Sequence, residues 1–225
     1  MGYLLTIEAP DASGKSTQVN ALTKRLEENG YKVRLVRFPN YGSDACKPVE
    51  LYLAGELGKN PADTGAYAAS VFFAVDRYFS YRTDWKKDLD DDKTVVILDR
   101  YTTSNAIHQH AKIDDEPEKC KILDWLYDFE FGTLELPKPD DTIFLNVEPE
   151  VSKKLLLARA EADSSHFTDI HEADTGYLRK CYNAALFAAD KKGWKKITCT
   201  KCGEMRTIED ISDEIWKYIS SKIGK

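Results

Sequence analysis

The stretch TIEAPDASGKSTQ, at residues 6–18, joins two segments of opposite character and decides the fold of the chain. Residues 3–8 form a short, almost continuous apolar run, which is typical of a buried parallel strand. Residues 15–29 repeat apolar side chains at helical spacing, and Gly30 supplies a C-terminal cap. The quoted stretch is therefore predicted to be the loop that leads from a buried strand into an amphipathic helix.

The end of this loop matches the phosphate-binding pattern G-x-x-x-x-G-K-[ST]. In such a loop the backbone N–H groups point at the phosphates, and the following helix adds its positive N-terminus. Lys15 is expected to reach the β- and γ-phosphates of ATP, and the hydroxyl of Ser16 to bind Mg²⁺. The loop residues predicted to contact ATP are Ser13, Gly14, Lys15, Ser16 and Thr17.

The first glycine of the pattern is replaced by Ala9. A glycine there allows tight backbone geometry, and alanine is the smallest replacement. The alternative is a chance GKST sequence at a helix N-terminus. The strand before the loop and the helix after it favour a working phosphate cradle.

Composition limits the other functions of the chain. Its 225 residues, 42% apolar and 31% charged, predict one folded domain spanning residues 1–225. A net charge of −6 argues against a general nucleic-acid binder. No apolar run approaches the roughly 20 residues of a membrane span, and no signal peptide is recognised. The five scattered cysteines, with Cys199 and Cys202 interpreted as incidental loop thiols, favour the cytoplasm.

Strands and helices are predicted to alternate along the whole chain. This alternation is typical of an α/β fold with a mainly parallel sheet that helices cover on both faces. The predicted strands are residues 3–8, 33–38, 94–99, 142–147 and 194–199. The predicted helices are residues 15–29, 48–57, 62–87, 101–111, 118–131, 149–160, 175–192 and 208–223.

Two pairs of residues suggest a second, anionic substrate with a flat ring. Arg37 and Arg100 lie at the C-terminal ends of predicted strands, where open α/β sheets bind ligands, and their guanidinium groups could hold a phosphate. Phe73 and Arg77 lie four residues apart on a helix, so they share a face. That face could stack a base on Phe73 and donate hydrogen bonds from Arg77 to its carbonyl edge.

Five segments in order give the chain an end-to-end resemblance to the thymidylate kinase family, which transfers a phosphoryl group from ATP to dTMP. They are IEAPDASGKST at residues 7–17, VRFPN at 36–40, FAVDR at 73–77, LDRYTTS at 98–104 and LPKPDDTIFLNVEPE at 136–150. The resemblance implies a three-layer P-loop NTPase sandwich with five parallel strands in the order 2-3-1-4-5. It also implies a short lid near residues 161–172, Mg²⁺ as cofactor and a homodimer, whose face could come from the aromatic-rich helix at residues 67–85.

The same resemblance assigns roles to individual residues. It implies that Asp11 binds the sugar 3′-hydroxyl and that Arg159 lies near the adenine of ATP. The residues implied for catalysis are Lys15, Arg37, Asp99 and Arg100. Those implied for the acceptor are Asp11, Arg37, Phe73, Arg77, Arg100, Ser104 and Gln109. Those implied for the metal are Ser16, Asp99 and Glu172.

The chain departs from the family pattern at two places. Ile107 and His108 replace Ala-Tyr, which alters one wall of the predicted acceptor pocket. Related kinases carry a catalytic arginine either in the phosphate loop, where this chain has Ala12, or in the lid, where no arginine lies between Arg159 and Arg179. We hypothesise that His166 or His171 supplies the lid charge; Arg206 and a slower enzyme are the alternatives.

These features predict an ATP-dependent kinase that converts dTMP to dTDP, without nucleic-acid or membrane partners. One alternative is a kinase for another nucleoside monophosphate or a nucleoside, because of the altered pocket wall. A second is a different class of P-loop ATPase. A third is a degenerate nucleotide-binding protein with little catalysis, because the usual arginine is missing.

Overall fold

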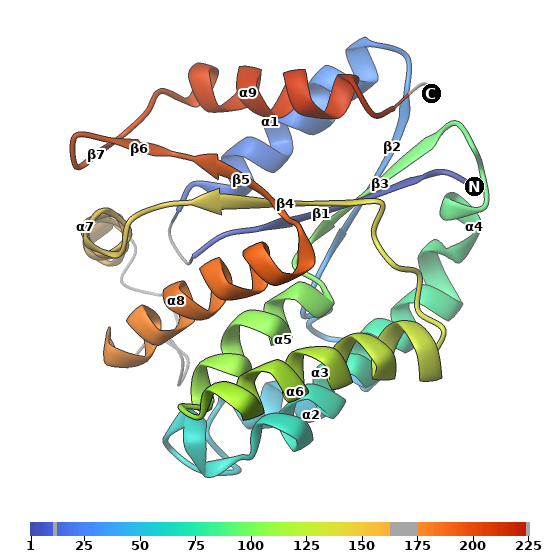
Figure 1. Ribbon diagram of the computed structural model, residues 1–225. Coiled ribbons are helices and arrows are strands. Elements are labelled where there is room, and N and C mark those ends of the chain that lie inside the picture. The colour runs from blue at the N-terminus through green and yellow to red at the C-terminus, as the bar shows by residue number, and fades with distance from the viewer. Residues whose placement is uncertain (11–12, 163–174, 224–225) are drawn as a thin grey trace.

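A computed structural model describes residues 1–10, 13–162 and 175–223 of the chain (Figure 1). Five parallel strands form one sheet in the order β2-β3-β1-β4-β5, as predicted. They are β1 (Tyr3–Glu8), β2 (Lys32–Arg37), β3 (Thr94–Asp99), β4 (Asp141–Asn146) and β5 (Lys195–Thr198). Helices cover both faces of this sheet, and the interior strand β3 is therefore buried at all six residues.

Strand register gathers polar residues at one edge of the sheet. Asp99, the last residue of β3, aligns with Ile7 of β1 on one side and with Arg37 of β2 on the other. Because the strands are parallel, their carboxyl ends meet at the same edge. The loop that follows β1 and the residues that follow β3 therefore lie side by side.

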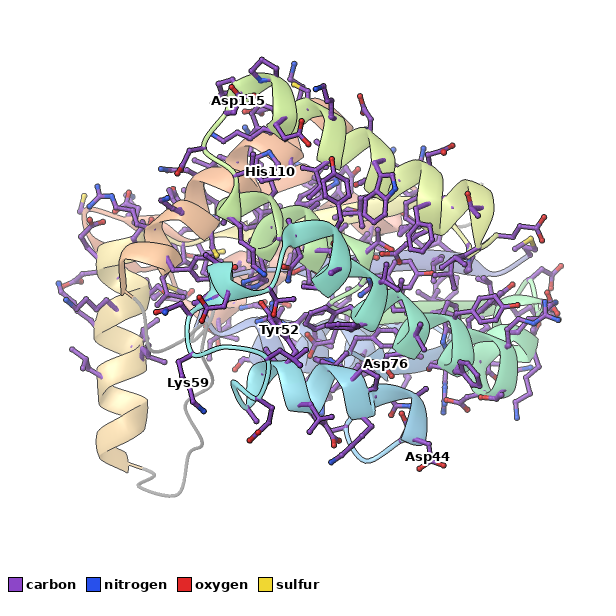
Figure 2. All side chains as sticks on the ribbon, turned by 90° about the horizontal axis from the view of Figure 1, so that it is seen from below. Asp44, Tyr52, Lys59, Asp76, His110 and Asp115 are labelled. Carbon is purple, nitrogen blue, oxygen red and sulfur yellow. The ribbon has the colours of Figure 1, made fainter. Side chains whose placement is uncertain are left out.

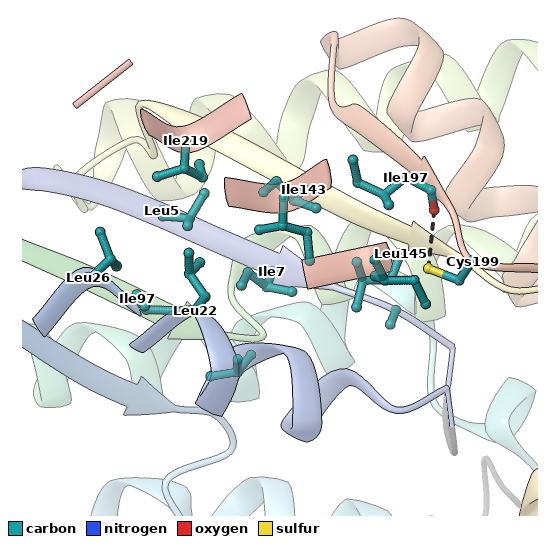
Figure 3. Packing of buried hydrophobic residues seen from close by; sticks show 14 of the residues in the cluster. Leu5, Ile7, Leu22, Leu26, Ile97, Ile143, Leu145, Ile197, Cys199 and Ile219 are labelled. Carbon is teal, nitrogen blue, oxygen red and sulfur yellow. Dashed lines mark hydrogen bonds between the residues drawn. The ribbon is translucent and has the colours of Figure 1, made fainter. Parts of the chain in front are cut away.

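One face of the sheet is covered by α1 (Lys15–Glu28) and α9 (Ile208–Ser220) (Figure 1). Figure 3 shows the apolar layer between them, with Leu22 and Leu26 of α1 and Ile219 of α9 against the strands. Alternation along each strand decides the layer, since Leu5 faces this cluster and Leu4 faces the opposite one.

The opposite face is covered by a thicker group of helices (Figures 1 and 2). They are α2 (Lys47–Leu53), α3 (Ala66–Ser80), α4 (Lys86–Leu89), α5 (Thr102–His108), α6 (Glu116–Tyr127) and α8 (Thr175–Lys192). The remaining helix, α7 (Pro149–Ala162), follows β4 and lies beside the sheet. In the described residues no helix has the length and apolarity needed to cross a membrane.

The long helix predicted at residues 62–87 is divided in the structure. A short 3₁₀ turn, Pro61–Asp63, precedes α3, and a π-helical turn, Tyr81–Trp85, separates α3 from α4. A second π-helical turn, Asp128–Thr133, follows α6. These turns bury Trp85 and Glu130, so tertiary packing sets them and hydrophobic periodicity does not reveal them.

The C-terminal region contains a hairpin that was not predicted. β6 (Thr200–Lys201) and β7 (Glu204–Met205) pair antiparallel, and Cys202 and Gly203 at its tip both have positive φ, 54° and 78°. Cys199 is buried and its thiol donates to the carbonyl of Ile197, while Cys202 is exposed. The two cysteines therefore occupy different environments within one short loop.

Candidate active site

The phosphate loop ends at a residue that must adopt a left-handed conformation. Gly14 caps α1 with φ 77° and ψ 14°, and the helix begins at Lys15. A side chain on Gly14 would meet nothing within 4 Å, so the backbone conformation alone favours glycine here. The N–H groups of the first turn of α1 are thus presented at the carboxyl end of β1, where an anion can bind.

The side chain of Lys15 crosses the sheet edge to reach Asp99. Its ammonium group donates to the Asp99 carboxylate, and Arg37 Nε lies 3.5 Å from the second oxygen of the same carboxylate. Burial lowers the pKa of Lys15 below its usual value, Arg100 adds to that effect, and Asp99 and Glu8 oppose it. The predicted Lys15, Arg37 and Asp99 therefore lie together.

Arg100 is held in an unusual backbone conformation beside a buried carboxylate. Its φ is 70°, and its Nη1 lies 3.9 Å from Glu8 Oε2. Glu8 is fully buried, and its Oε1 accepts hydrogen bonds from the hydroxyls of Thr103 and Ser104, each at 2.7 Å. A positive φ at a non-glycine residue is a form of strain that concentrates at functional sites.

A cavity of about 630 Å³ opens above the phosphate loop. Its lining includes Lys15 and Ser16 from the loop and Arg100 from the end of the neighbouring strand. It also includes Arg206, which precedes α9, and Ile208, the first residue of α9. Arg100 therefore borders the space where the phosphates of ATP would bind. Arg206 also borders it, but its guanidinium donates to Glu214 at 2.7 Å and to the Thr198 carbonyl at 2.6 Å.

The donor set at the loop fits magnesium. Mg²⁺ binds oxygen ligands, usually through one or two protein groups together with phosphates and water. The hydroxyl of the exposed Ser16 and the carboxylate of Asp99 are ligands of that kind. Asp99 lies beside the loop because it forms an ion pair with Lys15. Among the described residues no group of three or more His, Cys, Asp or Glu could hold a metal ion.

The residues predicted to hold the base lie on α3 and just after α5. Phe73 is half-buried and packs edge-on against Tyr52, with ring centroids 6.0 Å apart. Arg77 is buried and binds Glu130 through two hydrogen bonds of 2.6 and 2.7 Å, with a longer one of 3.4 Å from Nη1 to the Tyr101 carbonyl. Gln109 is buried, and its amide has no hydrogen-bond partner among the described residues.

Some of the predicted residues cannot be placed. Asp11, His166, His171 and Glu172 lie outside the described residues, as does most of the lid predicted at residues 161–172. Arg159 belongs to α7, but its side chain is likewise outside the described part of the chain. Their roles stay predictions.

Two site residues were missed from the sequence. In the sequence Glu8 is only one letter of the motif at residues 7–17, although its position at the end of a buried strand signals a functional carboxylate. Glu130 gave no usable signal, because it lies 53 residues from its partner Arg77 in the turn after α6.

The site defines a class of protein. A phosphate loop between a central parallel strand and a helix, with Lys15 and Arg37 paired to Asp99 and Arg100 lining the same cavity as Lys15, is the site of a P-loop phosphotransferase. The family model for thymidylate kinase matches residues 7–211, nearly the whole chain. The chain belongs to the thymidylate kinase family, whose members are ATP-dependent phosphotransferases.

Similar proteins agree with this family. A thymidylate kinase of Mycobacterium tuberculosis is 32% identical over 192 residues, which cover 85% of this chain and 87% of the relative. The thymidylate kinase of Homo sapiens is 29% identical over 215 residues, covering 95% and 88%. A solved thymidylate kinase structure from Candida albicans shares the fold, with a TM-score of 0.68 and 22% identity over 98% of this chain and 92% of the other.

Proposed function

We propose that the protein transfers the γ-phosphoryl group of ATP to dTMP, giving dTDP and ADP. The observation that carries this proposal is the pairing of Lys15 and Arg37 with Asp99, together with Lys15 and Arg100 in the lining of one cavity above the phosphate loop. Donor and acceptor phosphates carry like charges, so their approach requires such a group of cations. Membership of the thymidylate kinase family selects dTMP as the acceptor.

In this mechanism the chain contributes mainly position and charge. Lys15 contacts the β- and γ-phosphates while the loop N–H groups hold them, and Arg37 and Arg100 hold the acceptor phosphate in line with the γ-phosphorus. Asp99 keeps Lys15 and Arg37 in place. Ser16 and Asp99 would hold Mg²⁺, which neutralises charge on the transferred group when it is bound.

For the base, we propose contacts from three residues. Phe73 is half-buried and so can offer its ring to thymine. Arg77 gives two hydrogen bonds to Glu130, and the long Nη1 contact to Tyr101 leaves that nitrogen able to donate to a base carbonyl. The buried amide of Gln109 can supply a donor and an acceptor to the acceptor nucleoside.

The test is ADP release from ATP and Mg²⁺ with each common monophosphate. The thymidylate kinase of Candida albicans has broad substrate specificity, so dUMP and dGMP belong in the panel with dTMP. We expect dTMP to give a kcat/KM at least tenfold above the others, EDTA to abolish turnover, and Lys15→Met to lower kcat by about 10³ or more. A better acceptor than dTMP, or equal ATP turnover without any acceptor, would overturn the proposal.

We also propose a homodimer that acts in the cytoplasm. A stripe of exposed apolar residues runs along α3: Val71, Val75, Tyr78 and Phe79 are between 36% and 54% exposed. A contiguous apolar patch on a helix is typical of a protein interface. The five cysteines are free, which agrees with a reducing compartment. Sedimentation of the pure protein and fractionation of the cells that make it test these two points.

A further inference from the structure

His108, the last residue of α5, contacts the site through its imidazole. Its Nε2 lies 3.5 Å from Arg100 Nη1, and its Nδ1 lies 3.5 Å from the thiol sulfur of Cys181 on α8. This histidine stands where the family pattern has tyrosine, and a wall of the acceptor pocket was predicted there. The structure instead joins the side chain to an arginine that lines the cavity above the phosphate loop.

The contact with Arg100 favours one tautomer of this histidine. A guanidinium group can only donate, so His108 Nε2 must accept and the ring proton must lie on Nδ1. Nδ1 then donates to the sulfur of Cys181. A ring that carried protons on both nitrogens would offer Arg100 a second positive charge in place of a lone pair.

The backbone of His108 is fixed by the same helix. The Tyr177 hydroxyl donates a hydrogen bond to the His108 carbonyl, and both Tyr177 and Cys181 are buried on α8. The His108 backbone is therefore held by Tyr177 and its Nδ1 by Cys181, while Nε2 presents its lone pair to Arg100. Such support orients a flexible arginine at low cost in conformational entropy.

We propose that His108 is a positioning residue that orients the Arg100 guanidinium toward the phosphate of the acceptor nucleotide. The inference rests on the proposed function, because it takes the acceptor phosphate as the ligand of Arg100. The contact is long, so we expect a moderate effect on acceptor affinity and little effect on ATP. This role differs from shaping the base pocket, because His108 would act on the acceptor phosphate, through Arg100, and would not act on the base.

The experiment compares affinities for dTMP and thymidine, measured by calorimetry, in three variants. His108→Leu removes the acceptor atom, and His108→Gln can restore it with its side-chain carbonyl. His108 borders a cavity of about 340 Å³, which leaves room for either side chain. We expect His108→Leu to weaken dTMP binding five- to tenfold and thymidine binding less than twofold. We expect His108→Gln to recover most of the loss, and the matched control His110→Phe to change neither.

A double mutant completes the test. If His108 acts through Arg100, then Arg100→Met combined with His108→Leu should weaken dTMP binding no more than Arg100→Met alone. Additive losses, or equal losses for dTMP and thymidine, would overturn the inference. If the acceptor assay selects another monophosphate, the binding experiment uses that nucleotide and its nucleoside in place of dTMP and thymidine. A wrong choice of substrate is thereby distinguished from a wrong role for His108. Kinetics should show the same split, with a raised KM for the acceptor and an unchanged KM for ATP.

Discussion

Arg77 and Glu130 form an ion pair whose side chains are 1% and 0% exposed. Each charge lost most of its hydration on folding, so each depends on its partner. We predict that Glu130→Leu, which strands the Arg77 charge, lowers the free energy of unfolding by about 3–5 kcal/mol. Urea denaturation followed by circular dichroism measures this change.

The matched control is the double variant Arg77→Met with Glu130→Leu. It removes both charges, so we expect it to regain most of the stability lost in Glu130→Leu, although the Thr102 hydroxyl loses its acceptor as well. If the double variant were as unstable as the single one, the loss would come from packing and hydrogen bonds. The double variant should nevertheless bind dTMP poorly, because it lacks the proposed base contact of Arg77.

His110 provides a pH-dependent term in stability. It is buried against Phe187, with ring centroids 4.9 Å apart, and burial, with Lys119 second, lowers its pKa to about 4 (Figure 2). In the unfolded chain the pKa is about 6.5, so the unfolded state binds more protons between these values. The neutral ring therefore stabilises the fold fully above pH 6.5, and this contribution is lost as the pH falls toward 4.

We predict that this group alone lowers the free energy of unfolding by about 2 kcal/mol between pH 7 and pH 5. Urea titrations at both pH values measure the change. His110→Phe keeps an aromatic ring against Phe187 without a titrating group, so its stability should fall less over the same interval. Equal slopes for the two proteins would show that His110 does not titrate in this way.

At the scale of the element, α9 depends on Thr207, the N-cap residue that precedes it. The Thr207 side chain accepts a hydrogen bond from the backbone N–H of Asp210, and the helix then buries Ile211, Ile215 and Ile219 against the core. We predict that Thr207→Ala lowers the free energy of unfolding by about 1 kcal/mol, while Thr207→Ser retains it. Thermal or urea unfolding distinguishes them. Similar losses in both would mean that the threonine methyl group matters more than the cap.

The strands and the helices were predicted with different success, for a physical reason. The strand at residues 94–99 is a continuous buried apolar run and both its ends were found, as were those of the strand at residues 3–8. The ends of the other three strands were each predicted one residue away from their observed positions, and the order 2-3-1-4-5 was confirmed. The helices that pack on the sheet change into π-helical turns where Trp85 and Glu130 enter the core. Local periodicity continues through such turns, and for this reason the sequence overestimated the length of those helices.

In the candidate site, too, some features could be predicted from the local sequence and others could not. The placement of Lys15, Arg37, Asp99 and Arg100 at one edge of the sheet could be predicted, because they lie at strand ends or in the loop, and their catalytic roles stay predictions. The burial of Arg77 could not be predicted, since its partner Glu130 comes from another element and no local pattern links them. The same holds for the contact between His108 and Cys181, which are 73 residues apart.

At the scale of the whole molecule, the apolar packing on the two faces of the sheet differs. The face under α1 and α9 has one continuous apolar cluster. On the other face the described residues form three separate clusters, and the one between α2 and α3 includes Tyr52 and Ala69. A second side of α3 is exposed at Val71, Val75, Tyr78 and Phe79. An exposed apolar side on one helix of a layer suits a second copy of the chain.

We therefore predict that the α3 stripe is the dimer contact. Replacing Val75 and Phe79 by glutamate places two charges on each side of a twofold interface, so the double variant should sediment as a monomer of 25.5 kDa while the natural chain sediments as a dimer. The control is Leu157→Glu, which adds a charge at a residue 56% exposed on α7 and should stay dimeric. Equilibrium sedimentation at several concentrations decides between these results. A natural chain that is monomeric at every concentration, or a Val75→Glu/Phe79→Glu variant that stays dimeric, would exclude this stripe as the interface.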